Sequence, residues 1–164
     1  MEPTFTLPMA LGKAGKYRRF ITDYKPFIEG ENNIISAMAN TAAALREAFG
    51  FFWVGFYIVT DDSTLSVGPF QGGVACSRIR RGRGVCGTAW AEGHTIIVPD
   101  VDSFPGHIAC SSASRSEIVV PLINGTGQCL GVLDIDSDKP DDFDTTDQQG
   151  LEEVCRLMVA AIEA

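Results

Sequence analysis

The sequence predicts an α+β fold with a mostly antiparallel sheet. Apolar stripes at helical spacing lie near both ends of the chain, and about six strand-like segments lie between them. Tight turns join several of these segments, as is typical of antiparallel strands. The 164 residues suit one domain with a hydrophobic core, and no repeat or linker divides residues 1–164. We expect residues 1–15 to form an extended or flexible segment.

Two helices are expected before the sheet. An apolar stripe that begins at Tyr17 predicts a short helix over residues 15–25, which should end before Pro26 because proline interrupts helical hydrogen bonding. A second stripe predicts a helix from about residue 33 to residue 49, and Gly50 is its expected end.

The middle of the chain reads mainly as strands. Residues 51–60 are apolar and aromatic, and residues 64–70 and 73–79 follow as the next two strands. Residues 85–93 have a more helical pattern, and residues 95–100 form a short strand.

A hairpin and a helix complete the predicted fold. Residues 102–116 are rich in proline, glycine and serine and predict a long loop. Residues 116–124 and 128–137 then form two strands around an Asn-Gly-Thr-Gly turn. The final helix carries a clear apolar stripe, and we expect Thr145 or Thr146 to cap it.

Side-chain alternation places aromatic residues on one face of the first strand. Trp53, Gly55 and Tyr57 share this face because strand side chains alternate with a period of two. A glycine between two large aromatic residues should leave a dent with an aromatic rim. Trp53 and Tyr57 as ordinary core residues remain the alternative.

Three carboxylates interrupt the apolar faces of the predicted hairpin. Asp134 and Asp136 continue the face that carries Leu130 and Val132, and Glu117 lies at the start of the partner strand. Carboxylates beside apolar surface are costly unless they meet a cation or are protonated. If the faces agree, the three carboxylates together with Trp53 and Tyr57 would suit an ammonium group. Alternatively, the two aspartates only cap a strand end beside a solvated acidic loop.

The five cysteines fall into two groups. Cys76, Cys86 and Cys110 lie in loops or at the ends of elements, where a thiol can react, whereas Cys129 and Cys155 lie on a strand and on an apolar helical stripe. Cys86 is near the start of a short predicted helix, where the helix dipole favours thiolate. Four arginines would also favour thiolate unless they form a solvated loop; they are Arg78, Arg80, Arg81 and Arg83.

The cysteine spacing argues against a zinc motif. No CxxC pair occurs, and His107 with Cys110 is only a single short pair. His107 as the base for a Cys110 hydrolase nucleophile is conceivable, yet no oxyanion hole is marked. Thiol redox chemistry better explains several loop thiols beside a polar pocket.

Five segments closely resemble the free methionine-(R)-sulfoxide reductases, a family of single-domain GAF-fold enzymes. The resemblance covers nearly everything from about residue 31 to the final helix. A GAF domain that only senses a ligand would not be expected to carry the three cysteines together with the three acids. The segments are WVGFY (53–57), GPFQGGVAC (68–76), GRGVCGTA (82–89), GHIACSSASRSEIVVPL (106–122) and LGVLDIDS (130–137).

This resemblance implies a GAF fold, in which a six-stranded antiparallel sheet carries helices on one face and a small-molecule cavity on the other. It implies that free L-methionine-(R)-sulfoxide is reduced to L-methionine without a metal or an organic cofactor, through a cysteine sulfenic acid and an intramolecular disulfide. Thioredoxin is the reductant that the family implies, and a homodimer is common among such folds.

The resemblance also assigns roles by motif position. Cys110 resembles the thiol that attacks the sulfoxide sulfur, and Cys76 and Cys86 resemble the thiols that resolve the product. The positions that match the family's substrate-binding residues are Trp53, Tyr57, Glu117, Asp134 and Asp136.

The composition limits the partners. A net charge of −8 argues against nucleic-acid backbones and anionic membranes. No apolar run approaches the roughly 18–20 residues of a membrane span, and the N-terminus is a poor secretory signal, so the cytoplasm is the expected compartment. The rival functions are a non-catalytic GAF module that binds a small molecule and a thiol redox sensor without a substrate. A chain without an attached effector region makes a sensor the less favoured of these alternatives.

Overall fold

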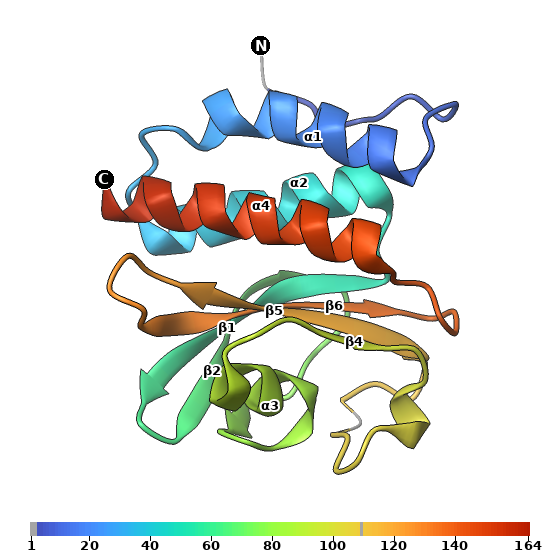
Figure 1. The fold of residues 1–164 in the computed structure, drawn as a ribbon, viewed down its shortest axis with the longest axis vertical. Coiled ribbons are helices and arrows are strands. Elements are labelled where there is room, and N and C mark those ends of the chain that lie inside the picture. The colour runs from blue at the N-terminus through green and yellow to red at the C-terminus, as the bar shows by residue number, and fades with distance from the viewer. Residues whose placement is uncertain (1–2, 109) are drawn as a thin grey trace.

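The computed structural model describes residues 3–108 and 110–164. A six-stranded antiparallel sheet with the order β3-β2-β1-β6-β5-β4 forms its centre. As Figure 1 shows, α2 and α4 cover one face of the sheet, α1 lies over these two helices, and α3 lies against the opposite face. The predicted fold class is therefore confirmed.

The element bounds follow the predicted order. The helices are α1 (Lys13–Ile28), α2 (Ile34–Phe49), α3 (Gly84–Glu92) and α4 (Thr145–Glu163), with a short 3-10 turn at Val101–Ser103. The strands are β1 (Trp53–Asp61), β2 (Thr64–Gln71), β3 (Arg78–Arg80), β4 (Ile96–Val98), β5 (Ser116–Ile123) and β6 (Cys129–Ser137). Within the described ranges, no helix is both long and apolar enough to cross a membrane.

Two helix ends differ from the prediction. Helix α1 continues past Pro26 to Ile28, because Ile28 is buried and its packing stabilises a last turn that proline weakens. The N-cap of α4 is Asp144 rather than Thr145 or Thr146, and it forms a reciprocal capping box with Asp147. The expected end of α2 is confirmed, since Gly50 adopts a left-handed conformation with φ of 66°.

The segment predicted as a strand over residues 73–79 is mostly irregular. Within this segment only residues 78–80, which form β3, pair with β2, and residues 72–77 leave the sheet. Gly72 has a φ of 134°, which favours glycine, and the Trp53 ring packs where a side chain at this position would lie. The chain thus turns over the face of the sheet that lies opposite α2 and α4.

The sheet separates two apolar clusters. The helix-side cluster contains Val54, Phe56 and Leu133, whereas Trp53, Tyr57 and Val132 belong to the other. Leu130 does not share the face of Val132, contrary to the expectation. Leu122 pairs with Gly131 and Ile123 with Cys129, so Leu130 is left unpaired in a bulge, and it packs on the helix side.

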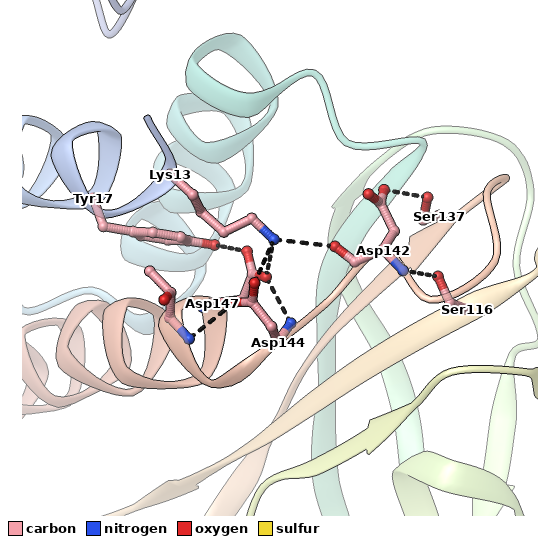
Figure 2. Close-up of polar contacts among 8 residues, drawn as sticks. Lys13, Tyr17, Ser116, Ser137, Asp142, Asp144 and Asp147 are labelled. Atoms are coloured by element: carbon pink, nitrogen blue, oxygen red, sulfur yellow. Dashed lines mark hydrogen bonds and ion pairs between the residues drawn. The ribbon is translucent and has the colours of Figure 1, made fainter. Parts of the chain in front are cut away.

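A polar network joins α1 to the start of α4. Asp147 is buried, and its carboxylate accepts hydrogen bonds from Tyr17 Oη (2.7 Å) and from Lys13 Nζ (2.6 Å) (Figure 2). Lys13 also reaches the main-chain oxygen of Asp142 at 3.3 Å. The buried carboxylate is therefore both paired and hydrogen-bonded, as such a group must be.

Candidate active site

The three predicted carboxylates meet on the face of the sheet that lies opposite α2 and α4. Register pairs Glu117 of β5 with Asp136 of β6, and Asp134 lies two residues before Asp136 on the same face. Across β1, Trp53 pairs with Asp136, which brings the aromatic face beside the acids. We call Glu117, Asp134 and Asp136 the acid cage.

Burial sets the electrostatics of the acid cage. Glu117 is only 5% exposed and Asp134 only 6%. Desolvation, followed by the charges of Asp134 and Asp136, raises the pKa of Glu117 well above its usual range. Desolvation and the charge of Asp134 likewise raise the pKa of Asp136. Among the described residues, Asp134 Oδ1 has no hydrogen-bond partner. The cage therefore favours protons or a bound cation.

The ends of the two acid-bearing strands are held by short polar contacts. Ser116 precedes Glu117, and its hydroxyl donates to the main-chain oxygen of Lys139 at 2.6 Å. Ser137 follows Asp136, and its hydroxyl donates to the Asp142 carboxylate (Figure 2). Both serines are buried, although Lys139 and Asp142 are exposed, and the two bonds restrict the strand ends beside the acid cage.

The two aromatic residues of β1 hold the loop that carries Cys76. Trp53 Nε1 donates to the oxygen of Gly73 at 2.9 Å, and Tyr57 Oη donates to the oxygen of Cys76 at 3.1 Å. The predicted dent at Gly55 is filled, because Phe70 and the Trp53 ring pack where its side chain would lie. Trp53 and Tyr57 are thus buried and also line the cavity.

Two of the three candidate thiols are joined. Cys76 and Cys110 form a disulfide with a Cα–Cα distance of 5.5 Å, which links the loop after β2 to the loop before β5. Cys110 is exposed and Cys76 is half-buried, so this sulfur pair lies within reach of solvent. Cys110 lines the cavity that the acid cage also lines. Cys76 adjoins this cavity, because it directly follows the lining residues Val74 and Ala75.

Cys86 differs from the expected activated thiol. It is buried in α3, and desolvation, with the charges of Asp134 and Glu117, raises its pKa well above the usual value. The nearby acids therefore outweigh the helix dipole that predicted a thiolate. All four arginines are exposed, as the alternative of a solvated surface predicted, but Arg78 and Arg80 belong to β3 rather than to a loop. Arg81 lies 5.0 Å from the centre of the Trp90 ring.

The two remaining cysteines are packing residues, as predicted. Cys155 belongs to the helix-side cluster, and burial raises the pKa of its thiol above the usual range. Cys129 is half-buried against the opposite cluster, and burial again raises its pKa. Neither is expected to react as a thiolate.

His107 is the residue whose role the sequence did not indicate. The pattern suggested it only as a partner of Cys110, but its Nε2 lies 3.8 Å from Glu117 Oε1. The loop carrying Cys110 thus brings a second polar group to the acid cage. No periodicity could have revealed this contact, because a loop carries no regular spacing.

The cavity enclosed by these groups is small. It has a volume of about 40 Å³, slightly more than the roughly 30 Å³ that one water molecule occupies in the liquid. An amino acid needs a larger space. The disulfide ties together the two loops beside the cavity, so we expect these loops to separate before a larger ligand binds.

The sequence matches the GAF domain model over residues 33–162. A protein of Escherichia coli named free methionine-R-sulfoxide reductase is 46% identical over 154 residues, covering 93% of this chain and 90% of its own length. The chain belongs to the GAF family of free methionine-R-sulfoxide reductases. GAF domain-containing protein A of Dictyostelium discoideum is 53% identical, with coverage of 89% and 92% respectively.

The structure agrees with this family. The free methionine-R-sulfoxide reductase of Neisseria meningitidis, solved in complex with its substrate, superposes with a TM-score of 0.93. Its sequence is 49% identical, and the match covers 99% of this chain and 96% of that one. The predicted GAF fold, with helices on one face of the sheet and a cavity on the other, is confirmed.

Proposed function

We propose that this protein reduces free L-methionine-(R)-sulfoxide to L-methionine. The observation that carries the proposal is a disulfide-bonded cysteine pair beside a cavity that the three carboxylates of the acid cage line. The family membership supports the same reaction class. A thiol supplies the electrons, and the carboxylates recognise the charged amine of the free amino acid.

The acid cage explains selectivity for the free amino acid. Buried carboxylates that repel one another gain most from a cation, and an ammonium group supplies one together with hydrogen-bond donors. A methionine within a peptide has an acylated nitrogen, which carries no charge and would leave the acids unpaired. The walls of Trp53 and Tyr57 face the apolar end of the substrate.

The proposed reduction starts at Cys110. Its thiolate attacks the sulfoxide sulfur, and a protonated carboxyl of the acid cage gives its proton to the sulfoxide oxygen. The hydroxyl then passes from the substrate sulfur to the Cys110 sulfur. The sulfur–oxygen bond of the substrate and the sulfur–sulfur bond formed by the attack both break, so methionine leaves and Cys110 becomes a sulfenic acid. The Cys76 thiol then attacks Cys110, the disulfide forms, and water leaves. The raised pKa of Glu117 suits it to the acid role.

The disulfide favours Cys76 over Cys86 as the resolving thiol. Cys86 is buried, and its raised pKa opposes thiolate formation, so an attack by Cys86 on Cys110 requires a larger rearrangement. An external dithiol, which we propose is thioredoxin, then exchanges with the exposed Cys76–Cys110 bond. Both protein thiols return, and the reductant leaves as its own disulfide.

A coupled assay tests the proposal. Protein, free methionine-(R)-sulfoxide, thioredoxin, thioredoxin reductase and NADPH should give NADPH consumption that depends on the sulfoxide. Peptide-bound methionine sulfoxide is the matched control and should give none. If NADPH were consumed with neither the free nor the peptide-bound sulfoxide, a ligand-binding GAF module would be favoured instead.

The cysteine roles are tested in a single turnover without reductant. Cys110→Ser should release no methionine, because the attacking sulfur is gone. Cys76→Ser should still release about one methionine per protein, since sulfenic acid forms before resolution. A full equivalent of methionine from Cys110→Ser would assign the attack to another thiol. Mass mapping of the wild-type disulfide after one turnover should find Cys76 joined to Cys110.

A further inference from the structure

We propose that Cys86, Glu117 and Asp134, with His107 beside them, form a binding site for Zn²⁺, and that zinc there excludes the substrate amine. The inference comes from one juxtaposition. A buried thiol of α3 lies against two buried carboxylates of β5 and β6, on the wall of the cavity. No short sequence motif unites these residues, since three separate elements supply them.

The donor atoms are already gathered. Cys86 Sγ and one carboxylate oxygen each of Glu117 and Asp134 all lie within 4.8 Å of one another. Zinc bonds of about 2.3 Å to sulfur and 2.0 Å to oxygen place neighbouring ligands roughly 3.5 Å apart. Side-chain rotations that move the donor atoms by about an ångström would therefore complete the geometry. His107 Nε2 lies 3.8 Å from Glu117 Oε1 but outside this three-donor group, and it becomes the fourth ligand by moving toward Cys86 and Asp134.

Asp134 supplies an independent indication that the site takes a cation. Its side chain is about nine-tenths buried or more, with only 6% of the residue exposed. Within the described part of the chain, its Oδ1 meets no hydrogen-bond partner. A buried oxygen of this kind is rare unless a ligand satisfies it. The cavity of about 40 Å³ has room for an ion, though not for an amino acid.

The chemistry of the donors selects the metal. Mg²⁺ and Ca²⁺ prefer sets made only of oxygen, whereas a thiolate with imidazole and carboxylate suits Zn²⁺. Coordination replaces the Cys86 proton by the metal, and the proton passes to the buffer. Asp136 adds negative charge nearby without belonging to the three-donor group.

The consequence for activity rests on the proposed function. Zinc at this site would occupy Glu117 and Asp134, the carboxylates that are proposed to bind the substrate ammonium. The metal and the sulfoxide then exclude each other, and zinc acts as a competitive inhibitor. Zinc binding itself does not depend on any reductase activity.

The test uses the oxidised 164-residue chain without added thiols. In this form Cys76 and Cys110 are joined, so the cysteines that still have a free thiol to bind a metal are Cys86, Cys129 and Cys155. Calorimetric titration with Zn²⁺ should give one site per chain. Co²⁺, used as a spectroscopic substitute, should produce a thiolate-to-cobalt charge-transfer band, which Zn²⁺ should abolish.

Two cysteine variants locate the site. Cys86→Ser should lose the band and weaken Zn²⁺ binding at least about 10–100-fold, the loss that removal of even an outer-shell partner causes. Cys129→Ser is the matched control and should keep both. Cooperative thermal unfolding of each variant shows that it is folded, and Cys86→Ala repeats the test without a hydroxyl. Absence of the band in wild type, or its persistence in Cys86→Ser, would overturn the proposal.

An activity measurement separates the two proposals. Zinc should raise the KM for free methionine-(R)-sulfoxide at constant kcat, with thioredoxin-dependent reduction of another protein disulfide as the control for the coupling enzymes. Metal binding without any reductase activity would refute the proposed function and leave the zinc site standing. Activity that zinc does not inhibit, in a protein that binds no Co²⁺ through Cys86, would refute the zinc site alone.

Discussion

At the scale of single residues, burial of the acid cage lowers the stability of the folded protein and provides the site proposed to bind the substrate ammonium. Glu117 is buried beside Asp134 and Asp136, and its pKa is raised by desolvation and by both neighbours. The folded state therefore holds a proton that the unfolded state releases above its ordinary pKa. By linkage, stability is greatest below that ordinary pKa and is lost as pH rises through the raised one. Binding of the substrate ammonium would restore part of the stability that is lost at higher pH.

Replacing Glu117 by glutamine should stabilise the substrate-free protein at neutral pH. Glu117→Gln keeps the shape and removes the free-energy cost of holding this carboxyl protonated in the folded state, and we expect a gain of about 1–3 kcal/mol. Such a gain corresponds to roughly 2–4 °C in Tm per kcal/mol in a chain of this length. The measurement is thermal unfolding between pH 5 and 8, where the difference from wild type should grow with pH.

Glu153→Gln is the matched control for that comparison. Glu153 is a surface residue paired with Arg156, and this pairing lowers its pKa, so the variant should be neutral or slightly less stable. The same Glu117→Gln protein should bind substrate more weakly. If its stability relative to wild type did not change with pH, the raised pKa would be wrong.

At the scale of elements, β5 and β6 place the acids, and the contacts at their ends fix them. The two strands pair in register from Ser116 and Ser137, one residue outside Glu117 and Asp136. The Asp142 carboxylate accepts a hydrogen bond from the Ser137 hydroxyl, and the main-chain amide of Asp142 donates a hydrogen bond to Ser116 Oγ at 3.3 Å. The acidic loop after β6 therefore acts on the site through these serines.

Removing the Ser137 hydroxyl should loosen the strand ends. Ser137→Ala loses a part-buried hydrogen bond to an exposed carboxylate, and we expect a cost of about 0.5–1.5 kcal/mol. Because the acid cage is displaced rather than removed, KM for the sulfoxide should rise more than kcat falls. Denaturant unfolding and steady-state kinetics measure the two effects.

Ser63→Ala is the corresponding control. Its hydroxyl donates to Asp61 in the exposed β1–β2 turn, which lies near the start of β6 and away from Ser137 at its other end. Its removal should therefore change stability by less than about 0.5 kcal/mol. Equal kinetic effects of both substitutions would mean that Ser137 has no specific role in holding the cage.

At the scale of the whole molecule, the two sides of the sheet divide the work. The helix side holds most of the buried apolar residues together with the Lys13–Asp147 network (Figure 2). The opposite side carries α3 (Figure 1). The acid cage and the two loops that Cys76 and Cys110 join lie on the same side. Stability can therefore rest largely on one face while loops on the other face move.

The closed cavity predicts that the redox state controls ligand access. Reduced protein should bind L-methionine, the proposed product, at least about tenfold more tightly than the disulfide form, because a cavity of about 40 Å³ cannot hold it. Calorimetric titration of both forms gives the affinities. Hydrogen exchange should be faster on reduction around residues 72–77 and 110–115, with α4 as the unchanged reference. Equal affinity in both forms would contradict a disulfide-closed cavity.

The sequence by itself determined the elements and the face on which the chemistry lies. Helical stripes and strand alternation depend only on local spacing, so they located α2, the β5–β6 hairpin, the shared face of Trp53 and Tyr57, and the shared face of Asp134 and Asp136. The strand pairing then showed that these faces coincide. The resemblance of whole segments indicated the GAF fold. Local spacing failed where packing intervened, as in the bulge at Leu130 and the last turn of α1.

Only the tertiary structure decided which groups meet. Cys76 and Cys110 are 34 residues apart and lie in loops, so nothing in their spacing shows that they pair while Cys86 stays free. The contact of His107 with Glu117 depends in the same way on how a loop crosses the sheet. The pKa of Cys86 also depends on this packing: the helix start favours thiolate, but burial against the acids reverses that preference. Contacts between loops arise from the packing of the whole chain, and a periodic pattern cannot encode them.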